Sequence, residues 1–265
     1  MSWAAIARKD FSDAVRSKAL WALTALFVVF MLGAAAGYGY FFDTTTAVDL
    51  LDLLSGPVNF LIPITALLAT IHSISGELES GTSKLLLSLP HTRRDVVIGK
   101  IVGRSAVMLI AVFIGVMSAG AYVFAVYTTV DAINYLGFAV FALLLALVYT
   151  SIGVGLSALA RSTSRSTIIA AGFYTLLSFV WPLILSVVAF TTSEDSILNL
   201  TPGRRQFLNQ IPPTDAITTA RAGFTSVMNT PAALATSKWV LLVIAIAWLL
   251  GVPAIGYWRF NTRDL

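Results

Sequence analysis

Residues 76–100 read GELESGTSKLLLSLPHTRRDVVIGK, a polar segment set between two stretches of nearly pure hydrocarbon. Charged residues fill 7 of these 25 positions, in a chain where only 11% of all residues are charged. A cluster of leucines lies in the middle of the segment. We interpret the segment as a short docking helix, held at one membrane face and offered to a soluble partner.

Local patterns in this segment predict a helix, a break and a second helix. Gly81 frees the backbone and the Thr82 hydroxyl can cap the first amides of a helix, so together they resemble a helix start. Pro90 ends that helix, because it lacks an N–H and pushes the preceding residue away from the α region. Three leucines share one face of the expected helix: Leu85, Leu86 and Leu89.

The second helix has its own start signal. Thr92 is followed three residues later by Asp95, immediately before the apolar run 96–98, which is the pattern of a capping box. We therefore expect the next membrane helix to begin near Thr92, outside the bilayer.

The whole chain is too apolar for a soluble domain. It has 265 residues, of which 57% are hydrophobic, and a mean hydropathy of +0.85, so we expect an all-α polytopic membrane protein. Cysteine is missing, which excludes disulfides and thiolate metal sites. Six stretches each supply the roughly 20 apolar residues of a spanning helix: residues 19–42, 53–75, 101–127, 135–160, 166–190 and 239–258.

Residues 1–18 alternate apolar and charged positions with the period of a helix. We interpret them as an amphipathic helix lying in the membrane interface, with its basic side chains reaching lipid phosphates. A solvated lead-in helix is the alternative.

The basic residues predict the orientation. With the N-terminus inside, inner segments hold 13 of the 17 Lys and Arg residues, while the short outer loops 43–52 and 128–134 hold none. The positive-inside rule therefore predicts that both termini are cytoplasmic in a multi-pass protein of the cell membrane. Since topology explains the net charge of +4, we expect no nucleic-acid partner.

The outer loop, residues 191–238, is long. Turn signals at 201–203 and 212–215 precede a helical pattern of apolar residues. We expect either one or two short helices that rest on the outer rim or dip into it, or an irregular surface loop.

Catalytic and metal-binding motifs are missing from the sequence. Neither His72 nor His91 has metal-ligand spacing, and no phosphate loop occurs, so we expect no enzyme activity, metal or cofactor in this chain. His72 is interpreted as an interfacial polar residue, with a proton relay as the alternative. No acidic residue lies deep in any of the six spans, which disfavours a mechanism driven by an ion gradient.

Pro57 and Pro63 interrupt the second predicted span, and Pro182 interrupts the fifth. Such residues release backbone carbonyls and permit a kink, and their role is either local packing or a hinge along a pathway. Asn59 lies between the first two prolines and is a candidate polar contact on that path. The candidate pathway and hinge residues are Pro57, Asn59, Pro63, Trp181 and Pro182.

The segment 76–100 resembles the permease subunits of ABC-2 type transporters. The resemblance rests on Gly-Glu-x-Glu-x-Gly-Thr, Leu-Leu-x-Ser-Leu-Pro and x-x-Arg-Arg-Asp, and residues 7–18 resemble the N-terminal elbow helix of that family. Within the family, the lead-in looks most like the branch that includes the permease of nitrous-oxide-reductase maturation. The six-span, N-in arrangement covers the whole chain.

The resemblance implies a function and partners. Two permeases would pair, as a homodimer or heterodimer, and each would bind a cytoplasmic ATPase that carries ATP and magnesium, in what we expect to be an exporter. Residues 82–90 would form the coupling helix, entered through Glu77, Glu79, Gly81 and Thr82. The leucines Leu85, Leu86 and Leu89, ended by Pro90, would occupy an ATPase groove, with Arg93 and Arg94 at its rim.

Two other classes of function stay open from the sequence. An intramembrane enzyme would use His72 or Asn59, and a pore or secondary carrier would need no ATPase.

Overall fold

The computed structural model describes residues 3–16, 18–42, 50–81, 92–191, 201–225 and 238–262, and these ranges contain helices and no strand. The predicted all-α class is therefore confirmed. In chain order the helices are α1 (Trp3–Arg16), α2 (Ala19–Phe42), α3 (Leu50–Thr70), α4 (Ser75–Glu79), α6 (Arg93–Val126), α7 (Ala132–Leu159), α8 (Thr163–Thr175), the π-helix η1 (Leu176–Val180), α9 (Trp181–Thr191), α10 (Pro202–Asn209), α11 (Pro213–Thr225) and α12 (Lys238–Asn261).

Six helical stretches of the described chain are long and apolar enough to cross a membrane, which confirms the predicted number. They are Ala19–Phe42, Leu50–Glu79, Arg93–Val126, Ala132–Leu159, Thr163–Thr191 and Trp239–Asn261. The third starts at Arg93, where Thr92 forms the predicted capping box with Asp95. That helix thus extends beyond the apolar stretch that was counted from residue 101.

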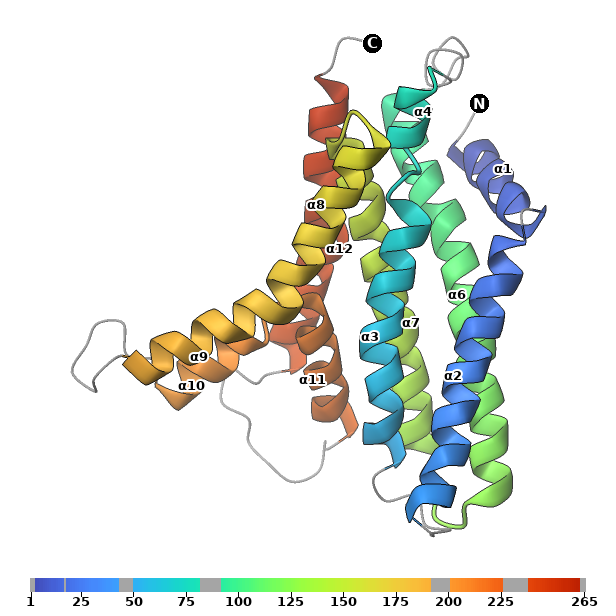
Figure 1. Ribbon diagram of the computed structural model, residues 1–265, viewed down its shortest axis with the longest axis vertical. Coiled ribbons are helices and arrows are strands. Elements are labelled where there is room, and N and C mark those ends of the chain that lie inside the picture. The colour runs from blue at the N-terminus through green and yellow to red at the C-terminus, as the bar shows by residue number, and fades with distance from the viewer. Residues whose placement is uncertain are drawn as a thin grey trace.

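The helix α7 is the centre of the bundle. In its most apolar window 72% of the residues are buried, and α3, α6, α11 and α12 all pack against it. The helices α2 and α1 lie along α6 on the other side (Figure 1). One end of the bundle carries α1, α4 and the last turn of α12, and we call it the α4 end (Figure 1).

Glycines let α7 and α12 approach closely. A Cβ added at Gly155 would lie 2.8 Å from the backbone atoms of Val252 and Pro253, and one at Gly256 would overlap the Gly155 carbonyl. Because backbone atoms cannot move aside as a side chain can, only glycine fits at these two positions.

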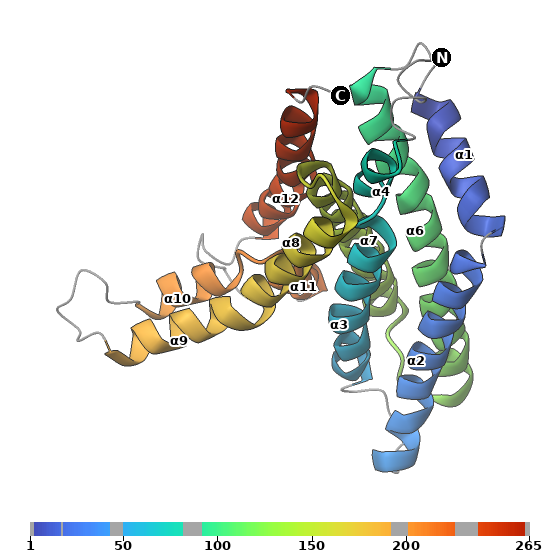
Figure 2. The ribbon, with the colours of Figure 1, turned by 45° about the horizontal axis from the view of Figure 1, so that its top comes forward.

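The fifth span leaves the bundle. Figures 1 and 2 both show the continuous helix α8–η1–α9 running diagonally away from the main bundle with α10 beside α9, and only 17% of its most apolar window is buried. Within it, η1 immediately precedes Trp181 and Pro182. The backbone N–H of Trp181 donates to the carbonyl of Leu176. The wider turn accommodates Pro182, which has no N–H to donate and would crowd a regular α-helix.

The second span breaks at a different place. The helix α3 runs without interruption through Pro57 and Pro63, ends at Thr70, and is followed by turns over residues 71–74 before α4 begins. The interruption in this span therefore lies next to His72 and away from the two prolines.

The described part of the segment 191–238, which the sequence predicts to be an outer loop, contains short helices, so the alternative of an irregular loop is wrong for residues 202–209 and 213–225. The helix α11 packs against α7 and α12, with Ala216, Ile217 and Ala220 almost fully buried. It therefore dips into the bundle.

Candidate functional site

The candidate site is a charged junction at the α4 end, and close packing of α1 on α6 positions it. A Cβ at Gly99 would lie 2.7 Å from the Ile6 Cβ, and one at Gly103 would lie 2.9 Å from the Ala7 carbonyl oxygen. The two glycines thus let the helices touch, and this contact brings the buried side chain of Asp10 against α6.

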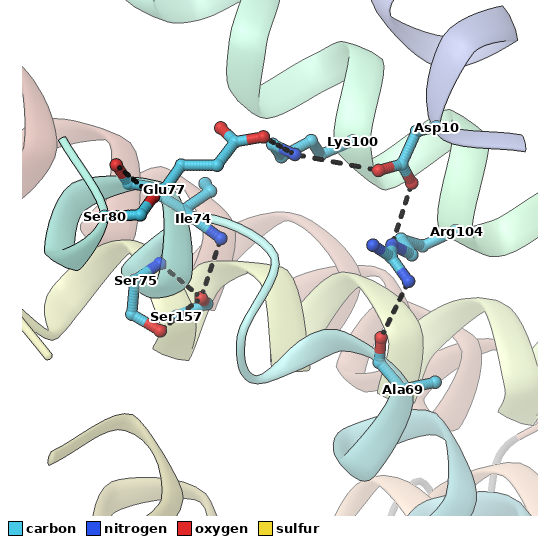
Figure 3. A network of polar contacts seen from close by, with 9 residues as sticks. All are labelled: Asp10, Ala69, Ile74, Ser75, Glu77, Ser80, Lys100, Arg104 and Ser157. Atoms are coloured by element: carbon cyan, nitrogen blue, oxygen red, sulfur yellow. Dashed lines mark hydrogen bonds and ion pairs between the residues drawn. The ribbon is translucent and has the colours of Figure 1, made fainter. Parts of the chain in front are cut away.

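Asp10 forms ion pairs with two cations of α6. Its Oδ2 lies 2.8 Å from Arg104 Nε and its Oδ1 lies 3.6 Å from Lys100 Nζ (Figure 3). The two cations stand four residues apart, on neighbouring turns of one helix face. One carboxylate therefore joins the amphipathic first helix to the third span.

Lys100 extends the junction to α4. Its Nζ donates to Glu77 Oε1 over 2.7 Å, and only 5% of its side chain is exposed. A buried ammonium is costly unless it is paired and hydrogen-bonded. Asp10 and Glu77 together supply that pairing, and with Arg104 the four charges sum to zero.

Arg104 also reaches the end of α3. Its Nη1 donates to the carbonyl of Ala69 over 3.3 Å. The last carbonyls of a helix have no partner within the helix, and a cation there also interacts favourably with the helix dipole. The junction thus includes the point where the second span breaks.

The start of α4 is fixed to α7. Ser157 Oγ accepts from the amides of Ile74 and Ser75, each over 3.0 Å (Figure 3). These bonds satisfy amides at the helix start that have no partner within α4. Ser166 of α8 donates to the carbonyl of Ile71, so the turns between α3 and α4 are also held from the fifth span.

Glu79 links α4 to the start of α8. One of its carboxylate oxygens accepts from the Thr163 amide over 2.8 Å and from the Thr163 hydroxyl over 2.6 Å. A carboxylate at a helix N-terminus interacts favourably with the helix dipole. Glu77 and Glu79, predicted from sequence as contacts to an ATPase, are therefore both bound within this chain, and their contact with a partner stays a prediction.

Gly81 ends α4. It has a φ of +74°, a backbone conformation that glycine adopts without strain, and it follows the C-cap residue Ser80. The described structure thus places Gly81 just after the end of α4, and the predicted helix start at Gly81 and Thr82 stays a prediction because residues 82–91 lie outside the described residues. Other members of the expected coupling helix lie outside the described residues: Thr82, Leu85, Leu86, Leu89 and Pro90.

Arg93 connects the second half of the segment to the C-terminal helix. Its Nη1 donates to the carbonyls of Phe260 and Asn261 over 2.6 and 3.1 Å, and its guanidinium lies 5.5 Å from the centre of the Phe260 ring. Arg93 thus caps the end of α12, while Arg94 is exposed at the α4 end. The predicted place of both at the rim of an ATPase groove stays a prediction.

The candidate pathway residues lie apart from this junction. Asn59 lines a cavity of about 10 Å³ together with Ser55 and Arg221, and its Oδ1 is buried without a hydrogen-bond partner in the described part of the chain. Arg221 Nη2 lies 3.4 Å from Ser55 Oγ and 3.7 Å from Asp52 Oδ1. Sequence reasoning missed Arg221, because nothing local shows that its loop enters the bundle.

His72 is exposed at the break in the second span. No group of three or more His, Asp or Glu side chains that could hold a metal occurs among the residues that the structure describes.

Comparison with known proteins decides the family. The model of the family described as "ABC-2 family transporter protein" matches residues 4–265. The chain belongs to this family. It is 29% identical to the "Probable ABC transporter permease protein NosY" of Pseudomonas aeruginosa, over 98% of each chain. It is 32% identical to the protein of the same name from Stutzerimonas stutzeri, over 68% of each chain. The predicted family is thus confirmed, along with the branch whose relatives it resembles.

Membership of the ABC-2 family identifies the kind of subunit. It is a multi-pass membrane permease of an ABC transporter, and ABC-2 permeases work with a cytoplasmic ATPase subunit that carries the catalysis. The permeases themselves are not enzymes.

Proposed function

We propose that this ABC-2 permease is the membrane half of an exporter, and that residues 76–94 receive the movement of a cytoplasmic ATPase. The observation that supports the proposal most is the junction of Asp10, Glu77, Lys100 and Arg104, which binds α4 to α1 and to α6. Since α4 leads directly into residues 82–91, a displacement of that segment pulls on two helices at once.

The proposal requires the α4 end to lie in the cytoplasm. It is supported by the distribution of basic residues, of which 13 of 17 belong to the segments that the sequence predicts to be inner. Among them are Arg94, Arg161 and Arg165, and Arg94 is exposed beside the segment that would meet the ATPase.

Movement would reach the spans by three routes. Glu79 connects α4 to α8 through its hydrogen bond with Thr163, and Glu77 connects α4 to α6 through Lys100. The ion pair of Lys100 with Asp10 then connects α6 to α1. The fifth span has a π-helix next to Pro182, and such a position can absorb a change of angle. ATP binding would thereby switch the spans between two states as rigid bodies.

A second permease subunit would pair with this one. The proposal is supported by the poorly buried fifth span, whose apolar side chains Ile168, Phe179 and Leu183 are 71%, 59% and 62% exposed. Lipid or a second permease must cover such a surface.

The decisive experiment is to isolate the permease with its ATPase and to measure complex formation and ATP hydrolysis in lipid nanodiscs. Leu86→Glu places a charge on the leucine face and should abolish co-purification while membrane insertion stays normal. Leu87→Glu makes the same substitution in the same segment, away from that face of the expected helix, and serves as the control. Undiminished binding of the ATPase to the Leu86→Glu variant would contradict the assignment of the leucine face as the ATPase contact.

Orientation is tested separately. The chain has no cysteine, so Ser88→Cys introduces a single thiol. An impermeant thiol reagent should label it only after the cytoplasmic side is opened. Labelling from outside in intact cells would invert the topology and overturn the proposal.

A further inference from the structure

The helix α11 carries an acidic residue to the middle of the bundle's length. Thr214 hydrogen-bonds through its Oγ1 to Tyr149 Oη over 2.8 Å, and Asp215 is the next residue. At 1.5 Å per residue, Tyr149 lies about 25 Å from the start of α7 and about 15 Å from its end. Asp215 therefore lies at a depth that corresponds to the hydrocarbon core of a bilayer.

Two tryptophan side chains fix the turn before α11 at this depth. Trp248 Nε1, from the middle of α12, donates to the carbonyl of Ile211 over 2.8 Å. Trp181 Nε1, from the start of α9, donates to the carbonyl of Leu208 over 2.9 Å. The turn that leads into α11 is thus bound to three different spans, counting Tyr149, and the position of Asp215 is part of the packed structure.

Asp215 points away from the packed side of α11. Its neighbours Ala216 and Ile217 are buried in the bundle, whereas Asp215 is on the exposed face. In the described part of the chain its carboxylate has no ion pair, and its own backbone amide is its hydrogen-bond donor. Arg221 of the same helix contacts Ser55 and Asp52 of the second span.

An unpaired carboxylate is costly at this depth if it faces lipid. An ionisable group at mid-membrane depth therefore faces water or a counter-charge, and it marks a solute path in most membrane proteins where it occurs.

We propose that Asp215 lines a water-filled path through the middle of the membrane and that this path accepts positively charged solutes. The proposal rests on the permease function and adds a substrate class to it. The carboxylate attracts positively charged solutes and repels anions.

Thiol accessibility tests the path. Asp215→Cys gives a chain with one thiol, which should react with the water-soluble reagent 2-(trimethylammonium)ethyl methanethiosulfonate in nanodiscs. Ile246→Cys is the matched control, because Ile246 is 52% exposed and lies within a turn of Trp248, at a similar depth. Faster reaction at residue 215 supports the path, and equal rates at the two positions overturn it.

The charge preference needs the carboxylate in place. Thr219 lies one turn after Asp215, at a Cβ distance of about 6 Å. In the Thr219→Cys variant, the rate of thiol modification by the trimethylammonium reagent is compared with the rate of modification by its anionic 2-sulfonatoethyl analogue. Asp215→Asn in that background should lower the ratio of these rates about tenfold at low ionic strength. An unchanged ratio would overturn the cation preference.

These measurements separate the inference from the proposed function. Both are made on the permease in lipid, with its ATPase present and without ATP, so they do not depend on coupled transport. Loss of ATPase binding would refute the proposed function alone, whereas an unreactive residue 215 in an intact complex would refute the path alone.

Discussion

Lys100 of α6 and Glu77 of α4 form a 2.7 Å hydrogen-bonded ion pair that bridges 23 positions of the sequence. Because Lys100 also lies 3.6 Å from Asp10, a single buried ammonium joins three helices at the α4 end. Removing one charge from such a group leaves another buried charge without compensation. We therefore expect substitutions in the junction to change the stability of the permease and its coupling to the ATPase.

Asp10→Asn should destabilise the permease by about 3 kcal/mol, because Arg104 would lose its ion pair and Lys100 would keep only the one with Glu77. The measurement is thermal unfolding in detergent at pH 7. Asp13→Asn removes an exposed carboxylate from the same helix and should change the free energy of unfolding by less than about 0.5 kcal/mol. Equal effects of the two variants would contradict the structural role of the junction.

Glu77→Gln should separate ATPase binding from ATPase coupling. The amide can still accept from Lys100 but loses the charge, so the complex should form while the link between α4 and α6 weakens. We expect a several-fold loss of the ATP-dependent change in thiol reactivity of a cysteine placed in the spans. A variant that binds its ATPase and couples as the wild type does would show that movement takes another route.

Gly155→Ala should destabilise the contact of α7 with α12 by about 1–3 kcal/mol, because the added methyl meets backbone atoms that cannot move aside. Gly251→Ala on α12 is the control, since a Cβ there has nothing within 4 Å. The control should be neutral or slightly stabilising, because alanine has the higher helix propensity. Thermal unfolding compares the two, and a neutral Gly155→Ala would contradict the close approach.

Trp248→Phe removes the indole donor and leaves the carbonyl of Ile211 without that partner, at a cost of about 1 kcal/mol. We expect faster amide hydrogen exchange over residues 208–216 and little change elsewhere. Trp258→Phe, at an exposed tryptophan of the same helix, should leave exchange in that segment unaltered. Unchanged exchange in both variants would mean that the indole does not hold the turn.

Sequence reasoning correctly predicted the features that depend on neighbouring residues. The six spans follow from the length of apolar runs, and the capping box at Thr92 follows from four consecutive residues. The departure from α geometry next to Pro182 follows from the chemistry of proline. Local patterns did not show that α3 would continue through Pro57 and Pro63, because packing of a helix against its neighbours decides whether a proline breaks it.

By itself, the sequence determined that this protein is a helical membrane permease, because burial in lipid requires long apolar helices and the polar segments between them carry family patterns. Only the tertiary structure decided which charges meet. Asp10 pairs with residues 90 or more positions away, and no spacing rule connects them. Asp215 belongs to a loop in the sequence, yet the insertion of α11 places it at mid-membrane depth. Depth and pairing arise from packing between distant helices, which local patterns do not encode.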